Sequence, residues 1–352
     1  TYRSSSGAAR HQKVFKERSK PLEASKRLAY YTLFVNSQIL HPCLCSWDKE
    51  FKVIIMKVPH FLVILGPTAS GKSGLAVKLA KKFDGEIISA DSRQVYRGLD
   101  IGAGKITKRE MQNVPHYLLD VANPKRVFSV AQYQKLAKQK IREILARNKL
   151  PIICGGTGFY IQAVVDDLVL PEVQANLKLR ESLARKNPEE LFKILQKLDK
   201  TRAQNIDKNN PRRLIRAIEI AKSLGQVPNF NKNKKAENEN KNIVIIGLNP
   251  PAEKLKKLIK IRLEKRLKSG LITEVRNLHE QEKLSWKRLE NLGLEYKFVA
   301  LFLQKKIKDK KEFTEKLNTA IWHYAKRQMT WFKRDERIRW LTEKQALKLK
   351  LK

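Results

Sequence analysis

The stretch "HFLVILGPTASGKSGLAVKLA" (60–80) constrains the fold more than any other part of the chain. Its aliphatic run at 60–65 predicts a buried strand, and the residues after Ser73 are typical of a helix. Between them, the pattern Gly66-x4-Gly71-Lys72-Ser73 is that of a loop whose backbone N–H groups approach phosphates. A chance match in a chain this long is on the order of one in a hundred. The stretch therefore predicts a polyphosphate site, with Lys72 as a point charge and Ser73 as a magnesium-facing hydroxyl.

Further strands are predicted at 86–90, 151–156 and 242–248, with a last one at 337–341. Helical patterns such as the one at 129–148 lie between them. Strands that alternate with helices predict an α/β fold, here a P-loop NTPase-like parallel sheet flanked by helices. Ligands of such sheets bind beyond the carboxyl ends of the strands. We therefore expect Asp91 and the Gly155-Gly156-Thr157 turn to share one edge with the glycine loop.

The chain divides into three predicted parts. Residues 57–167 and 242–345 form the α/β core, whose C-terminal part is helical. Residues 168–228 carry amphipathic helical patterns and no strand pattern, which predicts an all-helical insertion domain ahead of an exposed polar loop at 229–241. Residues 1–55 have no clear period, and we interpret them as an N-terminal extension outside the fold.

The charge of the chain indicates a polyanionic partner. Lys and Arg number 74 against 35 Asp and Glu, a net charge of +39. Such an excess favours binding to phosphates, although solvated basic helix faces are the plainer explanation. Cys43, Cys45 and Cys154 form neither a disulfide framework nor a four-ligand zinc set, which favours a reduced, cytoplasmic compartment. We expect no membrane span, because no apolar run reaches about 18 residues.

The segment "DSRQVYRGLDIGAGK" (91–105) begins where the second predicted strand ends. Asp91 could cap a turn, which is the common role of an aspartate after a strand. It could equally bind magnesium or accept a proton, because it lies beside the phosphate loop. Gly102 and Gly104 flank a bend that ends in Lys105, which we expect to be a second cation at the same edge.

Seven motifs occur in an order that resembles one enzyme family. They are "GPTASGKS", "DSRQVYRGLDIGAGK", "PHYLLDV", "FSVAQYQ", "GGTGFYIQA", "NPRRLIRAIE" and "AKRQMTWFKRD". Together they are similar to the bacterial tRNA dimethylallyltransferases, the IPP transferase family, from about residue 57 to 341. One segment departs from the family pattern, because Gly293-Leu294-Glu295 stands where many relatives carry a Gly-Tyr pair.

The resemblance implies a prenyl transfer in which the loop holds dimethylallyl diphosphate. The acceptor would be the exocyclic N6 of the adenine 3′-adjacent to the anticodon of a tRNA. Asp91 would orient this amine and take its proton, Thr157 would lie beside the prenyl carbon, and Lys72 and Arg266 would stabilise the leaving pyrophosphate with Mg²⁺. Arg262 shares the helix face of Arg266, and the sequence leaves open which of the two contacts the diphosphate. The implied diphosphate-binding set is Gly66, Pro67, Thr68, Ala69, Ser70, Gly71, Lys72, Ser73 and Lys105.

The resemblance also implies that two basic segments contact the anticodon stem-loop. One begins a helix after Pro211, and the other mixes cations with Trp331, which we interpret as core. Cations interleaved with aromatic side chains suit a splayed RNA loop. The implied partner is tRNA bound by a monomer. The predicted tRNA-binding residues are Asp91, Ser92, Arg93, Gln94, Arg212, Arg213, Arg216, Lys326, Arg327 and Gln328.

Three other functions remain open from the residues alone. A P-loop kinase would share the glycine loop, but no apolar run here ends in a clear acidic pair. A prenyltransferase for free adenine nucleotides would keep the loop and Asp91 without needing the basic helices. An inactive RNA-binding relative would have no need to retain Lys72, Ser73, Asp91 and Thr157.

Overall fold

The computed structural model describes residues 55–56, 59–228 and 242–351. Most of the predicted N-terminal extension and the predicted loop at 229–241 lie outside these residues. The strands are β1 (Ile55–Met56), β2 (Phe61–Leu65), β3 (Gly85–Ala90), β4 (His116–Tyr117), β5 (Leu150–Gly155), β6 (Ile243–Leu248), β7 (Ile338–Leu341) and β8 (Lys350–Leu351). The helices are α2 (Lys72–Lys82), α3 (Lys108–Met111), α4 (Val130–Ala146), α5 (Gly158–Val165), α6 (Leu177–Ala184), α7 (Pro188–Leu198), α8 (Lys200–Gln204), α9 (Pro211–Leu224), α10 (Ala252–Lys268), α11 (Leu271–Glu280), α12 (Trp286–Asn291), α13 (Leu294–Leu303), α14 (Lys310–Phe332) and α15 (Glu343–Leu347).

Six strands form one parallel sheet in the order β4-β3-β5-β2-β6-β7. This arrangement confirms the predicted α/β fold, and each predicted strand lies within a residue or so of an observed one. The sequence did not predict β4, because its two residues are too few for a periodic pattern. β1 and β8 pair with each other in a separate parallel ladder.

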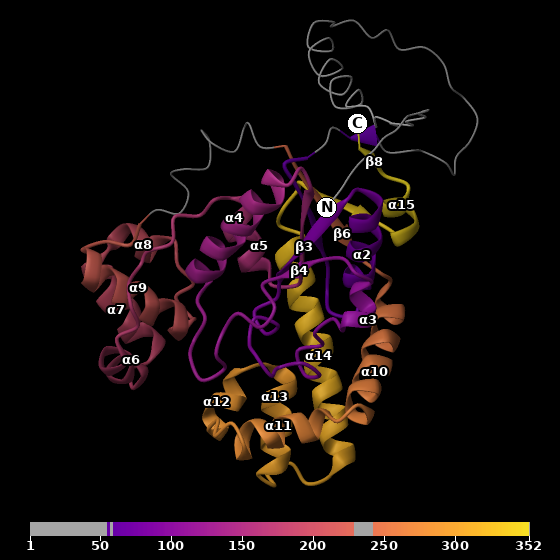
Figure 1. Cartoon of the computed structure of the whole chain (residues 1–352). Helices are drawn as coiled ribbons and strands as arrows, with labels where there is room; N and C mark the ends of the chain where they lie inside the picture. Colours follow the sequence, from indigo (N-terminus) through magenta and orange to yellow (C-terminus); the bar gives the residue numbers. More distant parts are fainter. Residues whose placement is uncertain (1–54, 57–58, 229–241, 352) are drawn as a thin grey trace, which may run out of the picture. The chain divides into compact units, whose positions relative to one another are not determined.

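Helices cover both faces of the sheet (Figure 1). On β2, Leu62 and Ile64 belong to the apolar cluster that includes residues of α2 and α15. Phe61, Val63 and Leu65 point the other way, into the cluster that includes residues of α4 and α5. Because every residue of β2 is buried, its sequence is continuously aliphatic instead of alternating.

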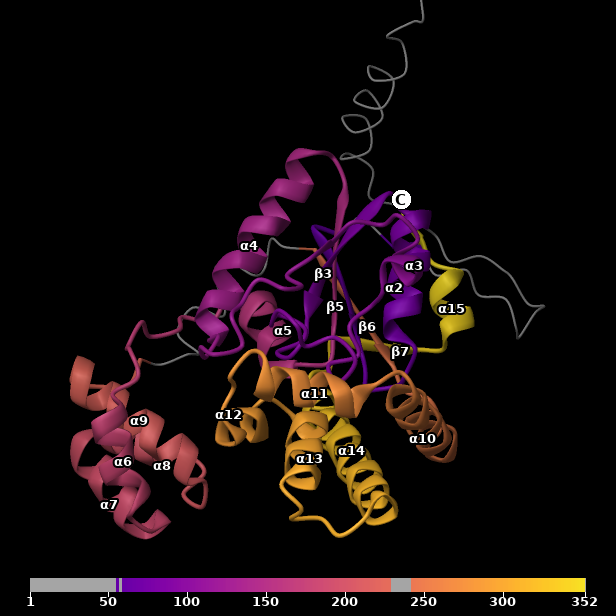
Figure 2. The same ribbon diagram turned by 60° about the horizontal axis from the view of Figure 1, so that its bottom comes forward.

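The carboxyl ends of three central strands are level. Gly155 at the end of β5 is the register partner of both Leu65 at the end of β2 and Ala90 at the end of β3. The residues that follow these strands therefore leave the sheet at one edge, as the parallel topology predicts. The C-terminal helices α10 to α14 gather at this end of the sheet and share its larger apolar cluster (Figure 2).

The described residues of the predicted insertion form α6 to α9 and no strand. Their buried side chains make an apolar cluster of their own, which includes Leu191, Leu195, Leu214 and Ile218. At the start of α9, Asn210 caps the helix by accepting a hydrogen bond from the N–H of Arg213, and Pro211 occupies the first turn.

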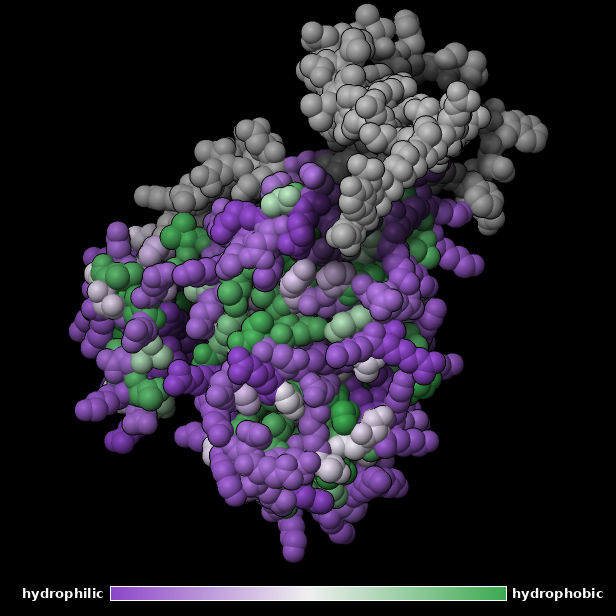
Figure 3. All heavy atoms as spheres, viewed as in Figure 1, coloured by the Kyte–Doolittle hydropathy of each residue, from purple (hydrophilic) through white to green (hydrophobic). Residues whose placement is uncertain are grey.

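Hydrophilic side chains cover most of the face shown in Figure 3, and a group of hydrophobic residues lies near its centre. Among the described residues, no helix combines the length and the hydropathy that a bilayer span requires.

Candidate active site

The glycine loop connects β2 to α2 and leaves the start of that helix open. Gly71 adopts a left-handed conformation with φ of 88°, and no side chain caps the first N–H groups of α2. Uncapped N–H groups at a helix start, together with the helix dipole, favour an anion. Lys72 Nζ donates a hydrogen bond of 3.2 Å to the carbonyl of Pro67, which holds the ammonium over the loop.

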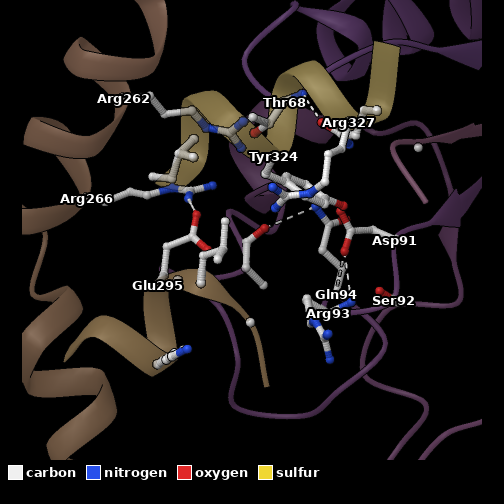
Figure 4. Close-up of a pocket in the computed structure, with 18 of the residues that line it drawn as sticks. Thr68, Asp91, Ser92, Arg93, Gln94, Arg262, Arg266, Glu295, Tyr324 and Arg327 are labelled. Atoms are coloured by element: carbon white, nitrogen blue, oxygen red, sulfur yellow. Dashed lines mark hydrogen bonds and ion pairs between the residues drawn. The ribbon is translucent and has the colours of Figure 1, made fainter. Parts of the chain in front are cut away.

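A cavity of about 450 Å³ opens beside this loop (Figure 4). Its walls come from the glycine loop, the two strand ends on the same edge, and helices α9, α10, α12, α13 and α14. The lining residues are Thr68, Lys72, Ser73, Asp91, Ser92, Arg93, Gln94, Gly102, Ala103, Cys154, Gly155, Arg212, Arg262, Arg266, Glu290, Asn291, Gly293, Leu294, Glu295, Lys297, Ile321, Tyr324, Arg327 and Gln328. Cations outnumber carboxylates, so the cavity suits an anionic ligand.

Asp91 follows β3 and both caps a turn and faces the cavity. Its Oδ1 accepts hydrogen bonds from the N–H groups of Arg93, at 2.8 Å, and Gln94, at 3.4 Å. Among the described residues, Oδ2 accepts no hydrogen bond. The turn therefore fixes the direction of the carboxylate and leaves one oxygen for a ligand.

Thr157 supports the Asp91 segment from the neighbouring strand end. Its hydroxyl oxygen accepts a hydrogen bond of 3.0 Å from the N–H of Ser92, and its own N–H donates to the carbonyl of Ala90 at 3.1 Å. Thr157 is not among the residues that line the cavity, whereas Ser92 is. In this structure Thr157 positions the neighbours of Asp91, and its predicted contact with the prenyl carbon stays a prediction.

Two arginines of α10 meet over a glycine at the far side of the cavity. Arg262 Nη2 donates to the carbonyl of Gly104 at 3.3 Å, and Arg266 Nη1 lies 2.6 Å from Glu295 Oε1. A Cβ atom on Gly104 would lie 1.8 Å from Arg266 Nη2 and 2.4 Å from Arg262 Nη2, so a side chain there would displace both guanidinium groups, and the φ of +58° also favours glycine. Burial, and then the neighbouring charge of Arg266, lower the pKa of Arg262 to about 10.

Burial also lowers the pKa of Lys72, to about 8. Arg262 and Arg266 contribute to this lowering after burial, while Cys154 and Asp91 act in the opposite direction. Repulsion between these cations means that a bound anion would relieve an unfavourable arrangement of charge. Cys154 lies in the same cavity, where burial raises the pKa of its thiol to about 11 and keeps it protonated at neutral pH.

Gln328 of α14 ties the glycine loop to the turn after β5. Its Oε1 accepts a hydrogen bond of 2.8 Å from the N–H of Thr68, and its Nε2 donates one of 2.8 Å to the carbonyl of Gly156. The side chain is buried, although it reaches the cavity wall. Gln328 was predicted to bind tRNA, but both ends of its amide are already bound to backbone groups, so the structure gives it a supporting role.

Of the predicted site residues, the structure brings a first group together around the cavity: Thr68, Lys72, Ser73, Asp91, Ser92, Arg93, Gln94, Arg212, Arg266, Arg327 and Gln328. Gly66, Pro67, Ala69, Ser70 and Gly71 form the loop beneath it. Both candidate arginines of α10 line the cavity, and their guanidinium groups lie together beside Gly104.

Lys105 is the clearest departure from the predicted site. It does not line the cavity, because its ammonium is bound by Asp100 at 2.5 Å, Asp120 at 2.6 Å and the carbonyl of Tyr96 at 3.2 Å. Its side chain is only 8% exposed. These partners give Lys105 a structural role in place of the predicted contact with the diphosphate.

The basic residues predicted to contact RNA differ in whether their side chains are exposed or already bound within the protein. Arg216 is paired with the buried Glu219 and donates to the carbonyl of Val173 at 3.0 Å, so it anchors the insertion. Arg213 is exposed, and the ammonium of Lys326 lies over the ring of Trp322. The helix that carries this second segment ends at Phe332, so Lys333 and Arg334 of the same motif lie just beyond its end.

Sequence reasoning missed the role of Tyr324. It lines the cavity from α14, is 36% exposed, and carries the guanidinium of Arg327 over its ring. Figure 4 shows it between the α10 arginines and Asp91. The spacing of Ile321, Tyr324 and Gln328 on one helix face could have indicated it, since residues three and four apart on a helix share a side.

Comparison with known proteins gives a consistent result. Residues 94–335 match the model of a family described as IPP transferase. The tRNA dimethylallyltransferase 2 of Treponema denticola is 45% identical over 276 residues, which cover 78% of this chain and 92% of that protein. The tRNA dimethylallyltransferase of Anoxybacillus flavithermus is 40% identical over 279 residues, or 79% and 89% of the two chains.

Two solved structures are similar in fold. The full-length tRNA isopentenylpyrophosphate transferase of Bacillus halodurans has 35% identity and a TM-score of 0.59, and the match covers 83% of this chain and 90% of that one. A eukaryotic dimethylallyltransferase acting on tRNA has 25% identity and a TM-score of 0.65, with coverage of 80% and 73%.

Proposed function

The chain belongs to the IPP transferase family, and we infer that it is an enzyme that transfers a dimethylallyl group to tRNA. We propose that the donor is dimethylallyl diphosphate and that the acceptor is the exocyclic N6 of the adenine 3′-adjacent to the anticodon. The observation that supports this most directly is the cavity itself. It places the phosphate loop and Asp91 around one space that cations dominate.

The proposed reaction exchanges one bond for another. The N6 amine attacks the first carbon of the dimethylallyl group while the bond from that carbon to the diphosphate oxygen breaks. A new N–C bond forms, pyrophosphate leaves, and the amine loses one proton to Asp91. The free Oδ2 of Asp91 suits this role, because its partner oxygen is held by the turn.

Charge builds up on the leaving pyrophosphate, and the cations around the cavity would stabilise it. Lys72 and the N–H groups at the start of α2 would hold the end nearest the glycine loop. Arg262 and Arg266 reach the same cavity from α10. Fixed cations in a partly closed cavity are more effective than the same groups in water, because they need no reorganisation during the reaction.

The residues present also fit the proposed magnesium ion. The Ser73 hydroxyl lines the cavity and offers a hard oxygen ligand of the kind that Mg²⁺ prefers. Magnesium typically completes its shell with substrate phosphates and water. When bound, the ion would neutralise charge on the diphosphate and so assist its departure.

The acceptor base would enter from the side lined by Arg93, Arg212, Tyr324 and Arg327. The exposed Arg212 and Arg327 can bind the RNA backbone, and the ring of Tyr324 can stack on an unpaired base. The adenine must leave the stacked loop to reach Asp91, since a stacked amine cannot approach a recessed diphosphate. We further propose that the enzyme works as a cytoplasmic monomer: the cysteine usage supports a reduced compartment, and the family resemblance supports the monomer.

One experiment separates this function from its alternatives. The enzyme is incubated with magnesium, radiolabelled dimethylallyl diphosphate and one acceptor at a time: bulk tRNA, AMP or ATP. We expect label in the tRNA alone. Label in AMP or ATP would indicate a transferase for free nucleotides. Hydrolysis of ATP without any transfer of label would indicate the kinase.

A further inference from the structure

One ion pair crosses the cavity between two of its helices. Arg266 comes from α10 and Glu295 from the first turn of α13, and Figure 4 shows them facing each other. The contact of 2.6 Å joins side chains that are only 11% and 18% exposed. Both residues line the proposed diphosphate site. A carboxylate so close to a cation in an anion-binding cavity requires an explanation.

Glu295 is favourably placed to remain a charged partner of Arg266. It is the acidic residue in the first turn of α13, where the helix dipole stabilises a carboxylate. Gly104 lies against the guanidinium of Arg266, since a Cβ atom built on it would be 1.8 Å from Nη2. Arg262, by contrast, has the carbonyl of Gly104 as its hydrogen-bond partner and pairs with no carboxylate among the described residues.

A diphosphate in this cavity would need the charge that Glu295 already neutralises. We propose that Glu295 is a positioning residue that holds Arg266 when the site is empty and competes with the diphosphate for it. The proposal rests on the proposed function, because it takes the ligand to be a diphosphate. Arg262 and Lys72 are then the cations available at first contact, and Arg266 joins them only by releasing Glu295.

The competition favours release of the product. When pyrophosphate begins to leave, Glu295 can pair with Arg266 again. The contact between Arg266 and pyrophosphate is then replaced by the ion pair within the protein. Replacing the carboxylate by an amide removes the competitor but keeps its size. Glu295→Gln should therefore bind pyrophosphate more tightly, show a lower KM for dimethylallyl diphosphate, and turn over more slowly as product release is delayed. A residue with a merely structural role would raise KM when changed.

The cavity supplies a matched control in Glu290. It lines the same space, but its Oε1 accepts a hydrogen bond from Gln304 at 3.3 Å and pairs with no arginine among the described residues. Glu290→Gln removes the same charge from the same cavity. It therefore tests whether net charge alone accounts for any change in pyrophosphate affinity.

The test is calorimetric titration of the full chain with magnesium pyrophosphate. We expect Glu295→Gln to bind about tenfold more tightly than wild type, and Glu290→Gln to change affinity by less than about threefold. Glu295→Asp, which retains the charge, should stay close to wild type. In a background of Arg266→Gln, the Glu295→Gln change should have no effect, because the competition no longer exists. Thermal unfolding of each variant verifies that it is folded.

Several results would overturn the inference. Unchanged or weaker pyrophosphate binding by Glu295→Gln would do so, as would equal tightening by Glu290→Gln or by Glu295→Asp. If wild type binds pyrophosphate and these results follow, the proposed function stands and only the role of Glu295 is wrong. If neither wild type nor Glu295→Gln binds pyrophosphate, the diphosphate site itself is wrong and the inference fails with it.

Discussion

The carboxylate of Asp91 accepts a hydrogen bond of 2.8 Å from the backbone N–H of Arg93. One side-chain oxygen thus shapes the turn after β3, while the other faces the cavity. The two interpretations that the sequence left open, a turn cap and a catalytic carboxylate, are compatible in one residue. The turn gives Asp91 a fixed direction, which a general base needs in order to come within hydrogen-bond reach of the proton.

Asp91→Asn should lower turnover by about two to four orders of magnitude, because the amide keeps the turn but cannot accept the proton. The measurement is the initial rate of label transfer to saturating tRNA. The Kd for tRNA should change little. Asp100→Asn, an exposed partner of Lys105, serves as the control. Near-normal turnover of the Asp91 variant would refute its role as the base.

Lys72 should make pyrophosphate binding depend on pH. Since burial lowers its pKa to about 8, the free enzyme carries a charged ammonium below pH 8 and loses it as the pH rises above 8. Bound pyrophosphate favours the charged form. Affinity should therefore fall by up to about tenfold per pH unit above 8, beyond the titration of pyrophosphate itself.

Lys72→Arg provides the reference for that titration, because its guanidinium stays charged throughout this range. Calorimetric titrations from pH 6.5 to 9.5 would measure both proteins. The difference between their slopes isolates the lysine. Parallel profiles for the two proteins would show that Lys72 does not titrate against the ligand.

The charged side chains at the cavity mouth should set the salt dependence of tRNA binding. Each phosphate contact lowers log affinity by about 0.7 to 0.9 per log unit of salt. Arg212→Ala combined with Arg327→Ala should flatten the slope by about two contacts and leave pyrophosphate binding intact. Filter binding at several salt concentrations gives the slope. The control pair is Lys81→Ala with Lys344→Ala, exposed lysines of α2 and α15 that do not line the cavity.

An unchanged slope in the Arg212 and Arg327 double variant would mean that these arginines face solvent in the complex. Equal flattening by the Lys81 and Lys344 pair would mean that the net charge of +39 acts as a diffuse field.

Glu274 should stabilise the bend that carries Gly102 and Ala103 to the cavity. Its carboxylate accepts hydrogen bonds from the N–H groups of Asp100, Ile101 and Gly102 and from the hydroxyl of Tyr296. Glu274→Ala leaves these donors without their partner and should cost about 2 kcal/mol of unfolding free energy, measured by urea titration. Glu280→Ala at the exposed end of the same helix should cost less than about 0.5 kcal/mol.

A loss of under 0.5 kcal/mol for Glu274→Ala would show that water replaces the carboxylate without penalty. The KM for dimethylallyl diphosphate should also rise in this variant, because the same bend positions Gly104 beneath the two arginines of α10.

The parts of the fold that the sequence predicted are those with local signals. The aliphatic run of β2 and the glycine loop each specify their own conformation within a few residues. Asp91 was placed correctly because parallel strands end at one edge. The contacts that could not be predicted join distant positions: Gln328 to Thr68 across 260 residues, and Arg266 to Glu295 across 29.

Lys105 is a case in which a contact between separate loops removed a residue that the sequence had placed at the site. Its position after a glycine bend predicted a free cation at the site. Instead, the ammonium pairs with Asp120, which lies 15 residues further along the chain, and so does not reach the cavity. Pairing of this kind depends on how two loops meet, which no local pattern encodes.

Helix α14 carries the residues for both proposed substrates within little more than one turn. Tyr324 and Arg327 face the entrance proposed for RNA, and Gln328 holds Thr68 of the glycine loop. A shift of this helix therefore moves the loop with it or breaks the Gln328 bonds. Such a linkage is reciprocal. If the bound donor raises the affinity of the enzyme for tRNA by some factor, bound tRNA raises the affinity of the enzyme for the donor by the same factor.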